Sequence, residues 1–154
     1  METIKNDKLK VEVSEHGAEL QSIKDNGGEE YLWQGDPAYW GRRSPILFPI
    51  VGTVNDNKYR VNGKEFQLTR HGFARDRDFK LLAKGDEQVV FGLHDTAETL
   101  ERYPFHFNLA VSYKLTDNRI HVVWHVENTD DKTICFQIGG HPAFLVPGAK
   151  AGEP

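Results

Sequence analysis

Two histidines in this sequence stand beside glycines, where their side chains could carry out proton-transfer chemistry. His71 precedes Gly72 in the segment RHGFARDRDF, and His141 follows Gly139 and Gly140 in the segment GGHPAF. A histidine gives or takes a proton near neutral pH, and a glycine leaves space for a ligand to approach the backbone. Because both motifs come where a strand is expected to end, together they predict a small-molecule site. Each motif taken alone is also compatible with an ordinary turn, in which glycine is common.

Two further histidines and the single cysteine offer weaker chemistry. His121 and His125 have the spacing of a helical zinc motif. On a strand they would lie roughly 13 Å apart, too far to share a metal ion whose ligand bonds are about 2 Å long. Cys135 belongs to no reactive motif and is expected to be a structural thiol. The spacing of these residues therefore predicts no metal site.

The overall composition indicates a globular protein. The chain has 154 residues, which suggests one domain. Its net charge of −4, with acidic and basic residues interspersed, gives no electrostatic reason to expect nucleic acid or an anionic membrane as a partner. There is no signal-peptide pattern and no apolar run long enough to cross a membrane. A lone cysteine cannot form an internal disulfide. These features predict a cytoplasmic protein.

Alternating hydrophobic residues predict strands along most of the chain. The clearest segments are 105–115, 120–127 and 134–138, which are joined by short polar turns and should form an antiparallel meander. The residues expected to face the core are Phe107, Leu109, Val111, Ile120, Val122, Trp124, Phe136 and Ile138. Weaker alternation predicts further strands at 9–13, 20–23, 31–34, 58–61, 65–69, 79–83 and 89–93. This succession predicts an all-β fold, an antiparallel β-sandwich.

Three local signals add detail to this fold. Asn62–Gly63 is the strongest hairpin turn in the chain. Residues 96–102 form the single helix candidate, which ends before Pro104. The segment 45–51 forms the first seven residues of PILFPIVG. It is apolar but contains two prolines, which exclude a central strand position. We expect it to be a buried segment that passes under the site.

Aromatic and charged clusters near these motifs have two readings each. Trp33, Tyr39, Trp40 and Phe48 lie close together in the sequence. They should mostly belong to the core, although an aromatic floor for a sugar ring is the alternative. The run of alternating charges at 75–78 is expected to be a solvated loop.

Together, these motifs resemble a known family. GAELQSI, Leu32–Trp33, Arg42 before PILFPIVG, RHGFARDRDF and GGHPAF follow one another in the order typical of the aldose 1-epimerase (galactose mutarotase) family, and most closely of its LacX-like branch. The resemblance covers essentially the whole chain. It implies a large β-sandwich of the supersandwich type that interconverts the α and β anomers of aldohexoses. It also implies that no metal or organic cofactor is needed.

The resemblance assigns roles to individual residues. His141 matches the general acid that protonates the sugar ring oxygen, and His71 matches a second histidine that holds the sugar near that oxygen. Arg42 resembles an arginine that hydrogen-bonds sugar hydroxyls, and Arg43 is a second candidate for that role. Ring opening needs one proton taken from the anomeric hydroxyl and one given to the ring oxygen. Rotation and reclosure then produce the other anomer.

The sequence departs from the family in its length. Family members are considerably longer, and their general base is a glutamate from the C-terminal half. Residues 1–154 are therefore expected to be the N-terminal part of a single mutarotase-like sandwich domain, truncated before the base and ending in the loop GAKAGEP. Unpaired strand edges in such a chain predict self-association. The alternatives are a non-catalytic carbohydrate-binding or regulatory module, and a purely structural sandwich.

Overall fold

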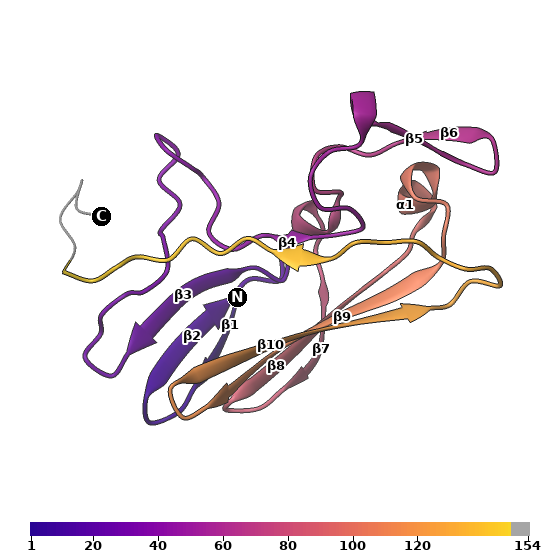
Figure 1. Cartoon of the computed structure of the whole chain (residues 1–154). Coiled ribbons are helices and arrows are strands. Elements are labelled where there is room, and N and C mark those ends of the chain that lie inside the picture. Colours follow the sequence, from indigo (N-terminus) through magenta and orange to yellow (C-terminus); the bar gives the residue numbers. More distant parts are fainter. Residues whose placement is uncertain (149–154) are drawn as a thin grey trace.

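Antiparallel strands make up most of the computed structural model, which describes residues 1–148 (Figure 1). One sheet has three strands in the order β1 (Glu2–Lys5), β2 (Leu9–Val13) and β3 (Leu20–Asp25). Strand β1 is a finding that hydrophobic alternation did not predict. The last six residues of the predicted terminal loop, 149–154, lie outside the described residues.

A second, larger sheet forms the other side of the molecule. Its order is β10-β9-β8-β7, in which β7 spans Lys80–Lys84, β8 Gln88–His94, β9 Phe107–Thr116 and β10 Arg119–Asn128. Burial alternates along β9, as the period-2 pattern predicted. The predicted core residues on this strand are all buried: Phe107, Leu109 and Val111.

Short elements complete the fold at one end of the two sheets. Strand β4 (Ile46–Leu47) pairs with β11 (Gly139–Gly140), and both lie above the larger sheets in Figure 1. The Asn62–Gly63 turn joins β5 (Lys58–Val61) to β6 (Lys64–Gln67), which confirms the predicted hairpin. The remaining elements are the 3₁₀ turns η1 (Asn55–Asn57) and η2 (Ala74–Asp76) and the helix α1 (Ala97–Arg102).

The predicted helix is confirmed, and its start has a clear local cause. Thr96 and Thr99 form a reciprocal capping box, in which each side chain accepts a hydrogen bond from the other residue's backbone N–H. This arrangement satisfies two backbone donors that an uncapped first turn would leave without partners. The helix lies close to the β5–β6 hairpin (Figure 1).

Side chains from both large sheets enter one core, which reaches up to β4. Phe48, directly after β4, is fully buried. Its ring lies 5.0 Å from that of Phe107 and 6.1 Å from that of Tyr103, measured between centroids. Burying an aromatic side chain of this size stabilises a fold by about 1.5–3 kcal/mol. The aromatic core therefore anchors the segment that carries β4.

The predicted third strand of the meander is wrong. Residues 134–138 have no strand conformation, and the segment leaves the large sheet to run beside the β4 region, where the backbone N–H of Gln137 donates to the carbonyl of Pro49 at 2.9 Å. This leaves β10 as an edge strand among the described residues. Val122, Trp124 and Phe136, predicted to be core residues, are consequently 38%, 36% and 41% exposed. Ile120 and Ile138 are half-buried.

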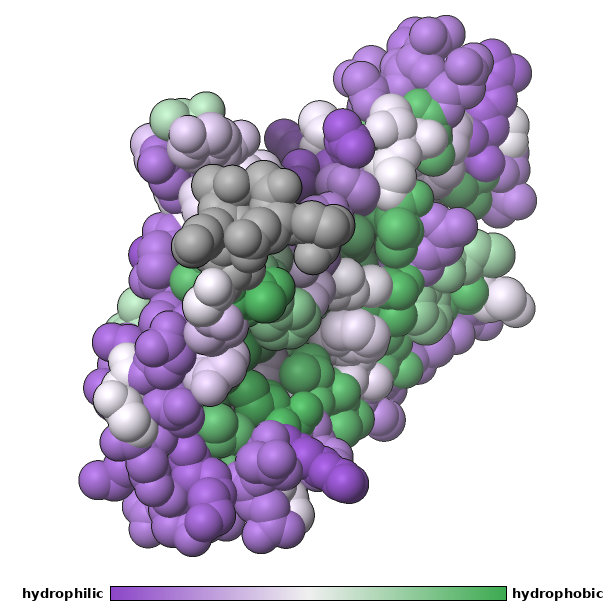
Figure 2. Space-filling view, turned by 60° about the vertical axis from the view of Figure 1, so that its left-hand side comes forward, coloured by the Kyte–Doolittle hydropathy of each residue, from purple (hydrophilic) through white to green (hydrophobic). Residues whose placement is uncertain are grey.

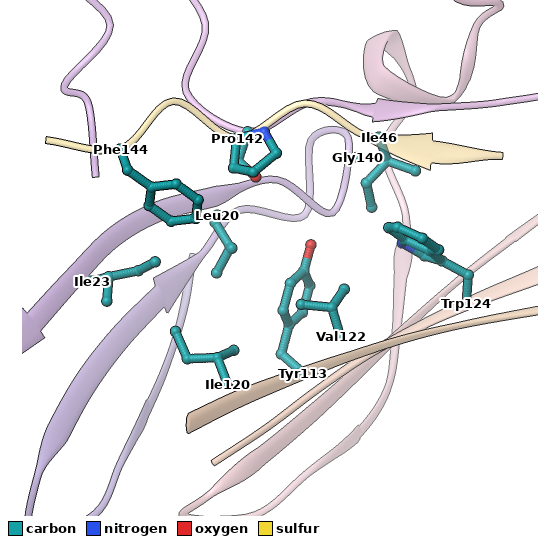
Figure 3. Close-up of a pocket in the computed structure, with 11 residues that line it drawn as sticks. Leu20, Ile23, Ile46, Tyr113, Ile120, Val122, Trp124, Gly140, Pro142 and Phe144 are labelled. Atoms are coloured by element: carbon teal, nitrogen blue, oxygen red, sulfur yellow. The ribbon is translucent and has the colours of Figure 1, made fainter. Parts of the chain in front are cut away.

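The open side of the large sheet forms a hollow that we call the apolar groove. Figure 2 shows hydrophobic side chains gathered there, and Figure 3 shows residues of β3 and β10 pointing into it. Its volume is about 250 Å³. The lining residues are Leu20, Ile23, Ser44, Ile46, Tyr113, Ile120, Val122, Trp124, Gly140, Pro142 and Phe144. Within residues 1–148, no helix is both long enough and apolar enough to cross a membrane.

Candidate functional site

The segment around β4 brings the two histidine motifs together. On one side, Gly139 pairs with Leu47 in the antiparallel β4–β11 ladder. On the other side, Gly72 forms a parallel bridge with Phe48. The segment 45–51, predicted to be buried, is buried over residues 45–49, whereas Val51 is 43% exposed. One histidine motif lies on each flank of this segment.

Close backbone packing explains the glycine after His71. A Cβ atom added to Gly72 would lie 2.2 Å from the carbonyl oxygen of Phe48, and this glycine has a φ of +71°. That same oxygen accepts hydrogen bonds from the backbone N–H groups of Phe73 at 3.0 Å and Ala74 at 3.1 Å. A side chain at position 72 would separate the motif from β4, so the residue type is dictated by packing.

His71 is held by its own backbone and ring. It has a φ of +68°, in the left-handed region. Its N–H donates to the carbonyl of Gly52 at 2.7 Å, and the N–H of Gly52 donates to the Nδ1 atom of His71 at 3.0 Å. Because Nδ1 accepts a hydrogen bond, the neutral ring carries its proton on Nε2. Burial lowers the pKa of His71, and the positive charges of Arg75 and Arg70 lower it further.

His141 is exposed and is positioned by a backbone hydrogen bond. Its N–H donates to the carbonyl of Pro45 at 3.1 Å, which continues the β11 pairing past β4. Its ring packs on that of Trp40, with centroids 5.0 Å apart. The segment that carries Trp40 is fixed in turn by Trp33, whose indole N–H donates to the Trp40 carbonyl at 2.8 Å. Trp40 thus forms one wall beside the ring of His141.

The two imidazoles share one hollow, which we call the histidine cavity. The ring centroids of His71 and His141 are 6.4 Å apart, and their planes are inclined by 58°. The cavity has a volume of about 180 Å³. Its lining residues are Trp40, Pro45, Leu47, Arg70, His71, Arg75 and His141.

Arg42 lies next to this cavity without lining it. Its guanidinium group donates to the carboxylate of Asp76 at 2.5 Å and to the carbonyl of Arg75 at 3.5 Å. Arg43 points elsewhere, because its guanidinium group donates to the carbonyl of Gln21 on β3. The structure therefore brings His71 and His141 together, sets Arg42 at the periphery and turns Arg43 away.

The loop that carries both arginines is fixed by a buried carboxylate. Glu19 is 7% exposed, and its Oε1 atom accepts hydrogen bonds from the backbone N–H groups of Arg43 and Ser44, each at 2.8 Å. These bonds hold the start of the segment that continues into Pro45. A buried carboxylate retained in this way is satisfied by hydrogen bonds rather than by solvent.

Two cavity residues were missed by sequence reasoning, Arg70 and Arg75. The charged run at 75–78 was expected to be solvated, yet the side chain of Arg75 is only 19% exposed. One of its terminal nitrogens donates to the carbonyl of Arg70 at 2.8 Å. The available signal was their position inside RHGFAR, on either side of the histidine that the motif presents. Trp40, expected mostly to be a core residue with an aromatic floor as the alternative, lines the cavity.

The apolar groove offers no comparable chemistry. It lies on the other side of β11 and shares Gly140 with the β4–β11 pair (Figure 3). The hydroxyl of Tyr113 is its one titratable group, and this hydroxyl donates to the buried carbonyl of Ala18 at 2.7 Å. Burial raises the pKa of Tyr113 well above its usual value. The two histidines of the histidine cavity have no counterpart in this groove.

The part of the chain that the structure describes contains no cluster of side chains that could bind a metal ion. No group of three or more histidine, cysteine or acidic side chains there could hold an ion. His121 and His125 lie on β10, as the strand assignment required. Cys135 is exposed and forms no disulfide.

Comparisons with known proteins agree with each other. The family model described as aldose 1-epimerase matches residues 2–153. A curated relative, Protein LacX (chromosomal) of Lactococcus lactis subsp. lactis, is 40% identical over 150 residues, which cover 94% of this chain and 50% of the relative.

Solved structures give the same result. A galactose mutarotase related enzyme from Lactobacillus acidophilus matches with a TM-score of 0.95 and 43% identity, over 99% of this chain and 51% of that one. A galactose mutarotase-like protein from Lactobacillus casei ATCC 334 matches with a TM-score of 0.93 and 47% identity, over 98% and 51%. The chain therefore spans about half the length of the relatives it matches.

Proposed function

This chain belongs to the aldose 1-epimerase family, and from that membership we propose that it carries the proton-donating part of a site that interconverts the α and β anomers of an aldose. The observation that carries the proposal is the histidine cavity. There, two imidazoles with centroids 6.4 Å apart face one small hollow that has an aromatic wall. A hollow of this kind suits a small polar ring compound.

In this proposal the two histidines have different tasks. His141 is exposed, so its ring can reach the ring oxygen of a bound sugar and give it a proton as the ring opens. His71 offers a proton on Nε2, because Nδ1 is occupied by the Gly52 N–H. Its lowered pKa keeps it neutral near pH 7 and fit to hydrogen-bond the same oxygen. A positioned general acid contributes typically 10²–10⁴-fold to such a rate.

The reaction also needs a base that removes the proton of the anomeric hydroxyl. None of the described residues that line the histidine cavity is a carboxylic acid. We propose that the base is a glutamate from the other half of the sandwich, as the family resemblance implies. Residues 1–154 would then form the first part of a single mutarotase-like domain. A cytoplasmic location stays a prediction.

A second candidate function is supported by the same observation. A cavity with donors and no carboxylate suits a carbohydrate-binding or regulatory module that binds an aldose without turnover. The two functions share the sugar-binding residues and differ only in the presence of a base. Measurement of turnover therefore separates them.

The experiment follows the optical rotation of freshly dissolved α-D-galactose and α-D-glucose in buffer containing EDTA. We expect little acceleration by residues 1–154 alone. We expect clear acceleration when the chain is joined to the second half of the Lactobacillus casei protein. Sugar binding without acceleration in the joined protein would favour the binding module. Failure of both binding and acceleration would exclude both functions.

A further inference from the structure

We propose that Trp33 is a positioning residue, which orients the imidazole of His141 through the ring of Trp40. This inference rests on the proposed function, because it explains how the proton donor of that site is held in place. Trp33 does not line the histidine cavity. Its indole N–H and its backbone N–H nevertheless bond to the two segments that place and orient the ring of His141.

The two histidine rings of the cavity are oriented by different means. The ring of His71 accepts a hydrogen bond from the N–H of Gly52 at 3.0 Å. The ring of His141 is exposed and packs on that of Trp40, with centroids 5.0 Å apart and planes inclined by 50°. An exposed side chain changes rotamer within nanoseconds when nothing restrains it. The position of Trp40 therefore decides how the ring of His141 is oriented.

Trp40 lies at the end of a tight turn. The carbonyl of Asp36 accepts the backbone N–H groups of Tyr39 at 3.1 Å and Trp40 at 2.8 Å, and the Asp36 carboxylate accepts that of Ala38 at 2.9 Å. These bonds shape the turn from within. They do not fix its place relative to the rest of the chain. The indole N–H of Trp33 does so, because it donates to the Trp40 carbonyl at 2.8 Å.

Trp33 is itself tied to the segment that carries His141. Its backbone N–H donates at 2.9 Å to the carbonyl of Ala143, two residues after His141. The preceding residue, Leu32, forms an antiparallel bridge with Phe144 and is fully buried. Trp33 thus connects the backbone that carries His141 to the residue whose ring packs on His141. The distance between these two parts is set by one side chain.

The chemistry of the tryptophan side chain suits this task. Its ring packs edge to face on that of Tyr39, with centroids 6.2 Å apart and planes inclined by 81°. Its single N–H donor reaches the next residue of the turn, Trp40. A phenylalanine would keep an aromatic ring and lose the donor. Trp33→Phe therefore removes the hydrogen bond while it retains a packing group.

Orientation matters because a general acid must lie within hydrogen-bond reach of the atom that it protonates. A displacement of about 1 Å, caused by a change outside the reacting groups, can cost roughly 100-fold in rate. An imidazole that turns freely is out of reach for much of the time. Trp33 and Trp40 would therefore contribute to catalysis without exchanging a proton.

The test follows the NMR signals of the histidine ring protons in residues 1–154 without ligand. The ring current of Trp40 displaces the signals of His141 from those of a free histidine. We expect Trp33→Phe to move them toward their positions in Trp40→Leu, which lacks the ring current. The spectrum of His141→Gln identifies the signals, because they are missing from it.

Tyr59→Phe is the matched control. It also removes a side-chain donor to a backbone carbonyl, since the Tyr59 hydroxyl donates to the carbonyl of Arg102 at 2.7 Å. Both this variant and Trp33→Phe should lower the free energy of unfolding, measured in urea. Only Trp33→Phe should move the signals of His141. A merely structural role for Trp33 would lower stability and leave those signals unchanged.

The joined protein supplies a second measurement. Trp33→Phe should lower kcat for anomer exchange by about 10- to 100-fold, and change KM less. The same substitution should cause no further loss of kcat in a protein that already carries Trp40→Leu, because its effect passes through that ring. Polarimetry of freshly dissolved α-galactose gives both constants.

Several results would overturn the inference. Unchanged His141 signals in a folded Trp33→Phe would do so, as would an equal displacement in Tyr59→Phe or a fully additive loss of kcat in the double variant. Trp40→Leu tests the same path if Trp33→Phe does not fold, because unchanged His141 signals there exclude any orienting role of Trp40. A joined protein that exchanges no anomers, while the NMR signals move as expected, would refute the proposed function alone.

Discussion

The rings of His71 and His141 lie 6.4 Å apart because their motifs flank the same short segment from opposite sides. Gly72 bridges Phe48 on one flank, and Gly139 pairs with Leu47 on the other. The segment between them is anchored in the aromatic core by the buried ring of Phe48. The site geometry is therefore fixed by backbone pairing at β4 and requires no direct contact between the two motifs.

Gly72→Ala should disrupt this geometry. The new Cβ atom would lie 2.2 Å from the Phe48 carbonyl oxygen, and the φ of +71° disfavours any L side chain. We expect a loss of about 2–4 kcal/mol in the free energy of unfolding, since strain and backbone displacement add. Urea denaturation followed by circular dichroism measures this loss.

Gly63→Ala is the matched control for that prediction. Gly63 has a φ of +82°, but an added Cβ atom would meet nothing within 4 Å. Its replacement should therefore cost only the conformational penalty, about 1–2 kcal/mol. Equal losses at both positions would show that close packing on β4 contributes nothing.

The pKa of His71 should lie below the ordinary histidine value of about 6.5. Burial is its first cause and Arg75 the second, so Arg75→Gln should raise the pKa of His71 without restoring it fully. NMR titration of the ring carbons measures both values. An unchanged pKa in Arg75→Gln would show that burial alone accounts for the shift.

The same shift sets the sign of a pH dependence. Because the folded pKa is lowered, the unfolded chain binds more protons as pH falls below about 6.5. Protonation of His71 should therefore lower the free energy of unfolding as pH falls from about 6.5 through the folded pKa. Above that window His71 should have no effect on this free energy. His71→Gln should flatten this part of the stability profile in urea titrations at several pH values.

Sequence patterns predicted local structure better than they predicted which segments pair with one another. Alternation identified the strand that carries Phe107, Leu109 and Val111, because burial on one face leaves a period of two. The same pattern at 134–138 was misread. Alternation does not say which strand a segment pairs with, and this one is drawn to the β4 region by the bond from Gln137 to Pro49.

The candidate site was predicted unevenly for a related reason. Histidines beside glycines carry a visible signal, and the structure places both at one cavity. Arg75 gave the opposite signal, because a run of alternating charges is usually solvated. The burial of Arg75 depends on tertiary packing. The backbone of Gly17 lies so close to Arg75 that a Cβ atom at position 17 would be 2.9 Å from the Arg75 carbonyl oxygen. No local pattern reveals that contact.

Self-association of residues 1–154 stays a prediction, and the open side of β10 is where we expect it. Val122 points into the apolar groove and is 38% exposed (Figure 3). Val122→Lys should therefore weaken association, because the lysine charge would be buried in an apolar contact. Val123→Lys, at an exposed position on the other face of the strand, should have little effect. Sedimentation equilibrium measures both, and a monomeric parent chain would contradict the prediction.

Catalysis by the joined protein should depend on His141 and not on histidines in general. Removal of a general acid typically costs 10²–10⁴-fold in rate, so His141→Ala should slow anomer exchange by about that factor. His125→Ala should leave the rate nearly unchanged, because His125 lies on exposed strand β10 and does not line the histidine cavity. Polarimetry of freshly dissolved α-galactose measures both rates. Equal losses in the two variants would indicate a folding defect. Full activity of residues 1–154 alone would show that the base already lies within this chain, and the assignment of that base to the other half of the sandwich would then be wrong.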